Sequence, residues 1–267
     1  WQAFADAQLS RWVELALERN NDVLTAMARV DEARANVDVA GAGAMPQLAV
    51  NAPGSANRSL SARTGQMVHV RSAQPVLQAS WELDLWDRLG SLSKAADLRL
   101  QASQADRDAV QLMVAATTAQ AYIGLRSLQA QIAVAQSTVH SREEAVRLLT
   151  DQVRVGYISQ LQQSQALAEL ESVKQSLEQL TLALQRQRIA LMQLVGGEGE
   201  AQAQELVQAT MVDGAAFNAM DMPVMPMPGL PSSLLERRPD IARAQLQLAA
   251  SDSNLAAQRA AFLPQVS

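Results

Sequence analysis

Few residues in this sequence have the types and spacing that catalysis or metal binding requires. Glu82 and Asp84 are paired carboxylates, but in a strand a spacing of two places both on one face. That arrangement favours a hydrated surface over a general acid and base. The two histidines, His69 and His140, fit neither a metal-ligand spacing nor a catalytic triad. We therefore expect no enzyme activity, no catalytic or metal-binding residues and no cofactor.

Two other motifs admit both a chemical and a structural interpretation. Gly41-Ala-Gly43 lacks the third glycine and the preceding strand of a dinucleotide-binding loop, so it does not predict a nucleotide site. Four methionines could bind a soft metal such as Cu(I) through their thioether sulfurs, although the prolines between them favour a connector that packs along a helix. The four are Met220, Met222, Met225 and Met227.

Composition excludes several classes of protein. The 267 residues include 22 basic and 27 acidic side chains, a net charge of −5, without the clustered basic surface that nucleic acid requires. Because there is no cysteine, disulfides and thiolate zinc sites are excluded. No apolar run reaches the roughly 18 residues of a membrane-spanning helix. The chain begins at Trp1, so we expect any targeting segment to lie outside it.

The first 90 residues are predicted to form helix and then a β-hairpin. Residues 6–45 have helical periodicity, with Asp6 as a possible N-cap and an end near Gly41 and Gly43. Residues 47–52 and 77–85 alternate with a period of two, and the polar stretch 53–66 lies between them. In the second strand the apolar face holds Leu77, Ala79, Trp81, Leu83 and Leu85, and the polar face holds Gln78, Ser80, Glu82 and Asp84.

The middle of the chain predicts a long helical hairpin. From about residue 91 to 155 there is no proline and a single glycine, which allows one helix of about 98 Å. Residues 125–153 and 166–194 carry stripes, mostly apolar, that step by three and four, as in a pair of packed antiparallel helices. At the predicted tip Gly156 supplies the conformation that the turn requires, and Ser159 is the expected N-cap of the returning helix.

The last segment contains an internal repeat. Residues 200–231, rich in proline, are expected to be an irregular connector, and Ser233 begins a capping box. Residues 235–267 then align without gaps on residues 17–49 at an offset of 218. Both copies should be a short helix broken near Asn21 or Pro239, followed by a longer one, and a second strand hairpin and helix pair are expected beyond Ser267. Identical pairs include Leu17 and Leu235, Glu18 and Glu236, Asp22 and Asp240, and Pro46 and Pro264.

Several motifs together resemble one known family. They are Trp1-Gln-Ala-Phe4-Ala-Asp6, Ala33-Arg34-Ala35, Trp81-Glu-Leu-Asp-Leu-Trp86, and Pro231-Ser-Ser-Leu-Leu-Glu-Arg-Arg-Pro-Asp-Ile241 followed by Ala260-Ala-Phe-Leu-Pro-Gln265. The family is the TolC-type outer-membrane efflux channels, and within it the chain is most similar to the lipoprotein branch that serves resistance-nodulation-division pumps. The resemblance covers essentially the whole chain.

The resemblance implies a mainly α fold with a β-hairpin. A long antiparallel helical hairpin would be an α-barrel element, and two strands would belong to a trimeric outer-membrane β-barrel. The implied divisions are 1–46 for the first-repeat N-terminal helices, 47–90 for the β-barrel hairpin, 91–199 for the helical hairpin of the periplasmic tunnel, 200–232 for the connector and 233–267 for the start of a truncated second repeat.

The same resemblance implies a function in efflux. The protein would be the outer-membrane channel of a tripartite system, a passive duct for small molecules or drugs with a periplasmic extension. Its partners would be a periplasmic adaptor (membrane fusion) protein, an inner-membrane pump, outer-membrane lipid and two further copies in a homotrimer. The apolar face of the second strand would contact lipid and its polar face the lumen.

The helix tip would meet the adaptor through Val155, Gly156, Tyr157 and Ser159. Tyr157 stands where the family carries leucine, and a plain helical turn explains the same residues, so both interpretations remain open. A rival function is a soluble periplasmic coiled-coil scaffold or the adaptor itself. Strands before the helical hairpin and a repeat after it favour the channel.

Overall fold

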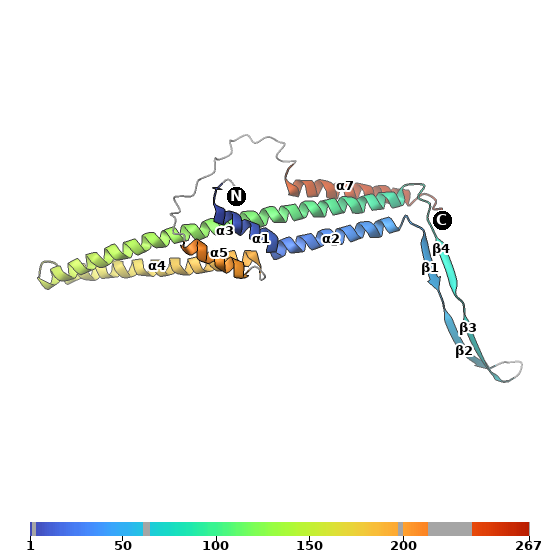
Figure 1. Ribbon diagram of the computed structural model, residues 1–267, viewed down its shortest axis with the longest axis horizontal. Coiled ribbons are helices and arrows are strands. Elements are labelled where there is room, and N and C mark those ends of the chain that lie inside the picture. The colour runs from blue at the N-terminus through green and yellow to red at the C-terminus, as the bar shows by residue number, and fades with distance from the viewer. Residues whose placement is uncertain (2–3, 61–64, 197–199, 213–236, 267) are drawn as a thin grey trace. The chain divides into compact units, whose positions relative to one another are not determined.

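The computed structural model describes residues 1, 4–60, 65–196, 200–212 and 237–266. In chain order the elements are helices α1 (Ala7–Arg19) and α2 (Asn21–Ala42), strands β1 (Gln47–Asn51), β2 (Gly54–Leu60), β3 (Met67–Ala73) and β4 (Val76–Ser80), and helices α3 (Arg88–Arg154), α4 (Gln160–Val195), α5 (Glu200–Val212) and α7 (Pro239–Ala260) (Figure 1). The chain folds as two compact units. The first is Trp1–Met27 with Arg107–Leu234, and the second is Ala28–Asp106 with Leu235–Ser267.

The predicted helical hairpin is confirmed by α4 and the part of α3 from Arg107 onward, which run antiparallel in the first unit (Figure 1). Side chains at the apolar stripe positions are buried or half-buried on both helices. Arg142, the charged member of the α3 stripe, is exposed and forms an ion pair with Glu169 at 2.8 Å, and Lys174 contacts Glu143 at 3.3 Å. None of the described helices combines the length and the apolar character that crossing a membrane demands.

The core of the first unit lies where α1 and α5 pack at the base of this hairpin. Trp12, Leu125, Leu191 and Val207 are completely buried in one cluster. The predicted N-cap Asp6 has two functions. One of its carboxylate oxygens accepts the first N–H groups of α1, and the other accepts the Tyr122 hydroxyl of α3 at 2.8 Å. The cap therefore also fastens α1 to the long helix.

The helix bounds confirm the internal repeat for its longer helix, whereas residues 235–236, which begin the second copy, lie outside the described residues. Helices α2 and α7 each contain 22 residues, and both their first and their last residues differ by 218. The break predicted near Asn21 lies at Asn20, whose extended backbone ends α1. The Asn20 side chain then accepts the N–H groups of Asp22 and Val23, so one residue ends the first helix and caps the second.

The structure differs from the sequence predictions in two segments. Residues 200–212, expected to be irregular, form α5, because Ala203 and Val207 can be buried in the first unit. The polar stretch 53–66, expected to separate the strands, contains β2, and β3 begins directly after it. The four methionines and the capping box at Ser233 lie outside the described residues, so their interpretations stay predictions.

Truncating Leu191 tests whether the stripe supplies the stability of the hairpin. Leu191 is fully buried, so Leu191→Ala should lower the free energy of unfolding by about 2–5 kcal/mol. Ile189 on the same helix is 64% exposed, and Ile189→Ala should have little effect. Denaturant unfolding of both variants makes the comparison, and equal losses would contradict the assigned core.

Candidate functional site

The strands form the two ends of one long antiparallel ribbon (Figure 1). β1 pairs with β4 and β2 with β3, and Gln74 N–H donates to Pro53 C=O where the two pairs meet. One face of the β1–β4 pair is apolar, with Leu48 opposite Ala79 and Val50 opposite Leu77. The other face is more polar, with Gln47 opposite Ser80 and Ala49 opposite Gln78. Over residues 77–80 the register follows the predicted alternation.

Both faces of this ribbon are open. Every ribbon side chain that the structure describes is exposed, and Leu48, Val50 and Leu77 are each about three-quarters exposed, at 74%, 75% and 73%. A two-stranded ribbon is marginal in water, and each of its edges presents unpaired backbone groups. The described chain therefore carries an apolar surface and two strand edges that require partners.

The strand prediction is wrong beyond Ser80. Because β4 ends there, Trp81, Glu82, Leu83, Asp84 and Leu85 do not continue the ribbon. They form a corner that leads into α3, with an isolated bridge from Leu83 to Val266. Apolar and polar side chains still alternate along residues 81–85, because an extended segment places successive side chains on opposite sides just as a strand does.

The charged residues of this corner organise the start of α3. Glu82 and Arg88 form a bidentate ion pair with contacts of 2.6 and 2.7 Å. The Asp84 carboxylate accepts the N–H groups of Arg88 and Gly90 at 2.7 and 2.8 Å, which satisfies donors that a helix start leaves free. Partial burial raises the pKa of Asp84, but the hydrogen bonds from Gly90, Leu89 and Arg88 and the Arg88 charge outweigh it and leave the pKa below its ordinary 3.8.

The tip of the helical hairpin has the geometry predicted for a tight turn. Gly156 has a φ of +78°, and its N–H donates to Val153 C=O while Tyr157 N–H donates to Gln152 C=O, both at 2.9 Å. This pair of bonds is a Schellman motif, which satisfies the last carbonyls of α3. The turn requires glycine because other residues adopt this conformation at a cost.

The tip also presents large side chains to the outside. Ser159 caps α4 in a capping box with Gln162, as predicted, so the turn is held on both sides. Val155 and Tyr157 are 75% and 81% exposed. The structure therefore brings the four predicted tip residues together on one turn that is hydrogen-bonded on both sides.

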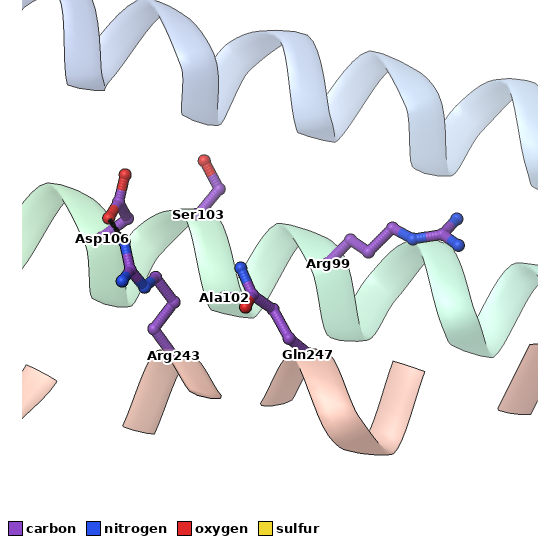
Figure 2. Close-up of a pocket in the computed structure, with 6 residues that line it drawn as sticks. All are labelled: Arg99, Ala102, Ser103, Asp106, Arg243 and Gln247. Atoms are coloured by element: carbon purple, nitrogen blue, oxygen red, sulfur yellow. Dashed lines mark hydrogen bonds and ion pairs between the residues drawn. The ribbon is translucent and has the colours of Figure 1, made fainter. Parts of the chain in front are cut away.

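A polar groove between α3 and α7 was missed by the sequence analysis (Figure 2). It has a volume of about 230 Å³ and lies over Ala102, between Arg99 and Asp106 on α3 and Arg243 and Gln247 on α7. Arg243 donates to Asp106 across 137 positions of sequence, a distance at which no local pattern signals a contact. Among the described residues no three His, Cys, Asp or Glu side chains gather as metal ligands would.

Comparison with known proteins identifies the family. The family model described as outer membrane efflux protein matches residues 12–197, most of the chain. The chain belongs to the outer membrane efflux protein family. Membership places the protein in the outer membrane of the Gram-negative envelope, and it disfavours the adaptor and scaffold alternatives.

The relatives of this efflux-family chain are longer than it is. It is 30% identical to the pyoverdine export outer membrane protein OpmQ of Pseudomonas putida and 30% identical to the cation efflux system protein CusC of Escherichia coli, in each case over 100% of this chain and 56% of the relative. The crystal structure of the Campylobacter jejuni CmeC outer membrane channel matches 99% of this chain and 56% of that one, with a TM-score of 0.81 and 25% identity. The chain thus spans about half the length of these relatives.

The positive φ of Gly156 predicts a graded response to substitution. Gly156→Val should destabilise the protein by about 1–2 kcal/mol, because a β-branched residue is strained in the left-handed region. Gly156→Asn should cost less, since asparagine tolerates that region. No atom lies within 4 Å of a Cβ added at Gly156, so crowding contributes nothing. Thermal unfolding that ranks the two variants equally would contradict this account.

The cap formed by Asp84 predicts a pH-dependent contribution to stability. Asp84→Ala should cost about 1 kcal/mol at neutral pH, as loss of a helix cap does. Because the folded pKa lies below 3.8, the wild-type advantage should be complete above that value and disappear as the pH falls through the folded pKa. Asp97→Ala, at an exposed position on the same helix, is the control. Unfolding of both variants against pH is the measurement, and an advantage of Asp84 that does not change with pH would contradict the assignment.

Proposed function

We propose that this chain is one half of a channel protomer that forms a passive duct for small molecules across the outer membrane. The observation that carries the proposal is the ribbon, whose edges are unpaired and whose apolar face is exposed. In lipid every strand needs a neighbour on each side, so only a closed barrel satisfies the backbone. A ribbon of two strands cannot form a closed barrel by itself. It therefore needs further strands from a second repeat and from other copies of the protein.

Lipid is the environment that fits the apolar face of this ribbon. Leu77 and Ala79, with Leu48 and Val50 opposite them, would contact acyl chains, whereas Gln78 and Ser80 would face a water-filled bore. Four strands from each full protomer and three protomers would give a barrel of twelve. Trimer assembly is part of the proposal, and the exposed backbone edges support it.

Helices α2 and α7 support a closed helical wall below such a barrel. Although they are copies of one repeat, they bury opposite faces. α2 buries Val23, Ala26 and Val30 and leaves Val39 exposed at 72%. α7 buries Ala250, Ala257 and Ala260 and leaves Leu248, the counterpart of Val30, exposed at 65%.

A helix with apolar residues on two opposite sides is suited to lie between two neighbours. In the described chain each copy uses one of its two sides. In the proposed duct the free side of each would pack on another long helix, either of the second repeat or of the next protomer. The wall would then close without any further element.

The helix tip is proposed to dock the periplasmic adaptor, which would connect the duct to an inner-membrane pump. Its support is the hydrogen-bonded turn at Gly156 and the exposure of Val155 and Tyr157, with Ser159 on the same turn. The energy for export would come from the pump. The relatives are named for pyoverdine and for cations, and a passive duct is compatible with either kind of cargo.

A matched pair of strand variants tests the barrel. Leu77→Arg should lower the stability of the assembled barrel by about 2–4 kcal/mol if Leu77 lies near the middle of the bilayer. Gln78→Arg on the adjacent, opposite-facing position should be tolerated. Outer-membrane assembly of the full-length protein and drug susceptibility of the cells measure both. Equal defects in the two variants would mean that the ribbon is not a barrel element.

A charge at the tip tests the docking role separately. Tyr157→Asp should leave trimer assembly unchanged, because the side chain is 81% exposed, but should abolish cross-linking to the adaptor and restore drug susceptibility. Gln175→Asp, at an exposed position along α4, is the matched control and should change neither. Normal cross-linking and normal export in Tyr157→Asp would reduce the tip to an ordinary turn.

A further inference from the structure

The polar groove between α3 and α7 has the shape of a small binding site. Its lining on α3 is Arg99, Ala102, Ser103 and Asp106, and this spacing of three, four and seven residues is the one that surrounds a single hole on a helix surface. Ala102 is only 4% exposed, so a methyl group forms the floor. The volume of about 230 Å³ is below the roughly 300 Å³ at which sites for drug-sized molecules begin. The groove therefore has room for one small chemical group.

The groove carries a net positive charge. Arg99 and Arg243 contribute two guanidinium groups and Asp106 contributes one carboxylate, which leaves one positive charge in excess. Figure 2 shows that Arg243 reaches from α7 to Asp106, whereas Arg99 extends along α3 away from this ion pair. The charge in excess is therefore that of Arg99.

Three polar side chains of the groove have unused donors. Arg99, Ser103 and Gln247 form no hydrogen bond or ion pair with another residue in the part of the chain that the structure describes. A guanidinium, a hydroxyl and an amide can each donate to an oxygen atom, and a carboxylate is the acceptor whose geometry matches a guanidinium. A ligand with one carboxylate would satisfy both the net charge and these donors.

The groove lies on the face of α3 that continues the polar face of the ribbon. Glu82 belongs to the polar side of the alternating residues 78–84 and pairs with Arg88 at the start of α3. Arg99 and Asp106 follow Arg88 by 11 and 18 residues, which is about three and five turns of an α-helix. The three side chains therefore share one face of α3. In the proposed duct the polar face of the ribbon lines the bore, so the groove would open into the bore as well.

We propose that this groove is a weak subsite for the carboxylate of a small solute on the bore side of the helical wall. The inference rests on the proposed function, because a bore exists only in the assembled duct. The Arg99 guanidinium would pair with the carboxylate, and Ser103 and Gln247 would donate hydrogen bonds to it. An ion pair that is open to water is weak. Weak binding suits a duct, since a solute that is held tightly in a pore does not leave it.

Fluorine NMR with trifluoroacetate, a small monovalent carboxylate, measures this binding on the purified full-length protein. Arg99→Gln should lower the affinity for trifluoroacetate, followed by line broadening, by about two- to fivefold, because an exposed ion pair is lost. Gln247→Leu changes no charge and should lower the affinity as well. Lys94→Gln is the matched control, since it removes the same charge from an exposed position on another face of α3, and it should leave the affinity unchanged.

Two results of this measurement would overturn the subsite. One is an affinity that is the same in Arg99→Gln and in the wild-type protein. The other is a loss in Arg99→Gln without any loss in Gln247→Leu, because Arg99 would then act as an isolated surface charge and not as part of the groove.

Single cysteines test whether the groove faces the bore. The chain contains no cysteine, so Arg99→Cys and Asp97→Cys can each carry a bulky polyethylene glycol maleimide in the full-length channel. The two positions are exposed and, two residues apart, lie on opposite sides of the helix. In a planar lipid bilayer the polymer at position 99 should block most of the ion conductance, and the polymer at position 97 should leave it unchanged.

The outcomes in the bilayer separate the subsite from the channel itself. If the unmodified protein assembles but conducts no ions, the proposed function fails. If the channel conducts and the polymer blocks it from position 97 and not from position 99, the groove faces away from the bore, and the inference fails while the channel stands. Equal effects of the polymer at the two positions also overturn the inference.

Discussion

This structure depends on one constraint: a backbone N–H or C=O group that is removed from water needs a hydrogen-bond partner in the protein. The ribbon from β1 to β4 pairs its inner edges and leaves its outer edges unpaired in the described chain, and Leu48, Val50 and Leu77 are about three-quarters exposed. Neither feature is stable for an isolated hairpin. Both become stabilising once more strands close the edges and lipid covers the apolar face. The ribbon therefore requires neighbouring strands, and the proposed assembly of several copies in a membrane would supply them.

The helical part solves a related problem in a different way. Backbone groups inside a helix are already paired, so its neighbours are chosen by side chains. The stripes of α3 and α4 pair these two helices, and the Asp6 carboxylate fastens α1 to α3 through Tyr122. Helices α2 and α7 have apolar residues on opposite sides and bury one side each. A repeated helix that has apolar residues on two opposite sides can extend a helical wall. One side packs on the preceding helix, and the other side remains available for the next one.

The corner joins these two kinds of structure. A strand needs neighbours beside it, whereas a helix start needs acceptors for its first N–H groups. Asp84 supplies those acceptors, Glu82 neutralises Arg88, and the tryptophans bond to the turns that follow α2 and α7. Glu82, Asp84 and Arg88 find their partners inside the corner, whereas Asp87 and the large apolar side chains are exposed. The tip is the counterpart at the other end of α3, where the turn at Gly156 satisfies the last carbonyls and presents Tyr157 outward.

The sequence by itself determined the elements whose stability is local or periodic. Apolar steps of three and four predicted α3 and α4, a glycine between two stripes predicted the tip, and an offset of 218 predicted that α2 and α7 have equal lengths. Each of these depends on residues close in sequence or on a copy of them. Only the tertiary structure decided that residues 54–60 form a strand, that residues 81–85 turn a corner and that Glu200–Val212 is helical. Polar β2 is held by backbone pairing with β3, the corner by Val266 and the two turns, and α5 by a core from other helices. The same separation in sequence hid the contact of Asp106 with Arg243, since its cause lies in packing between segments that no local pattern connects.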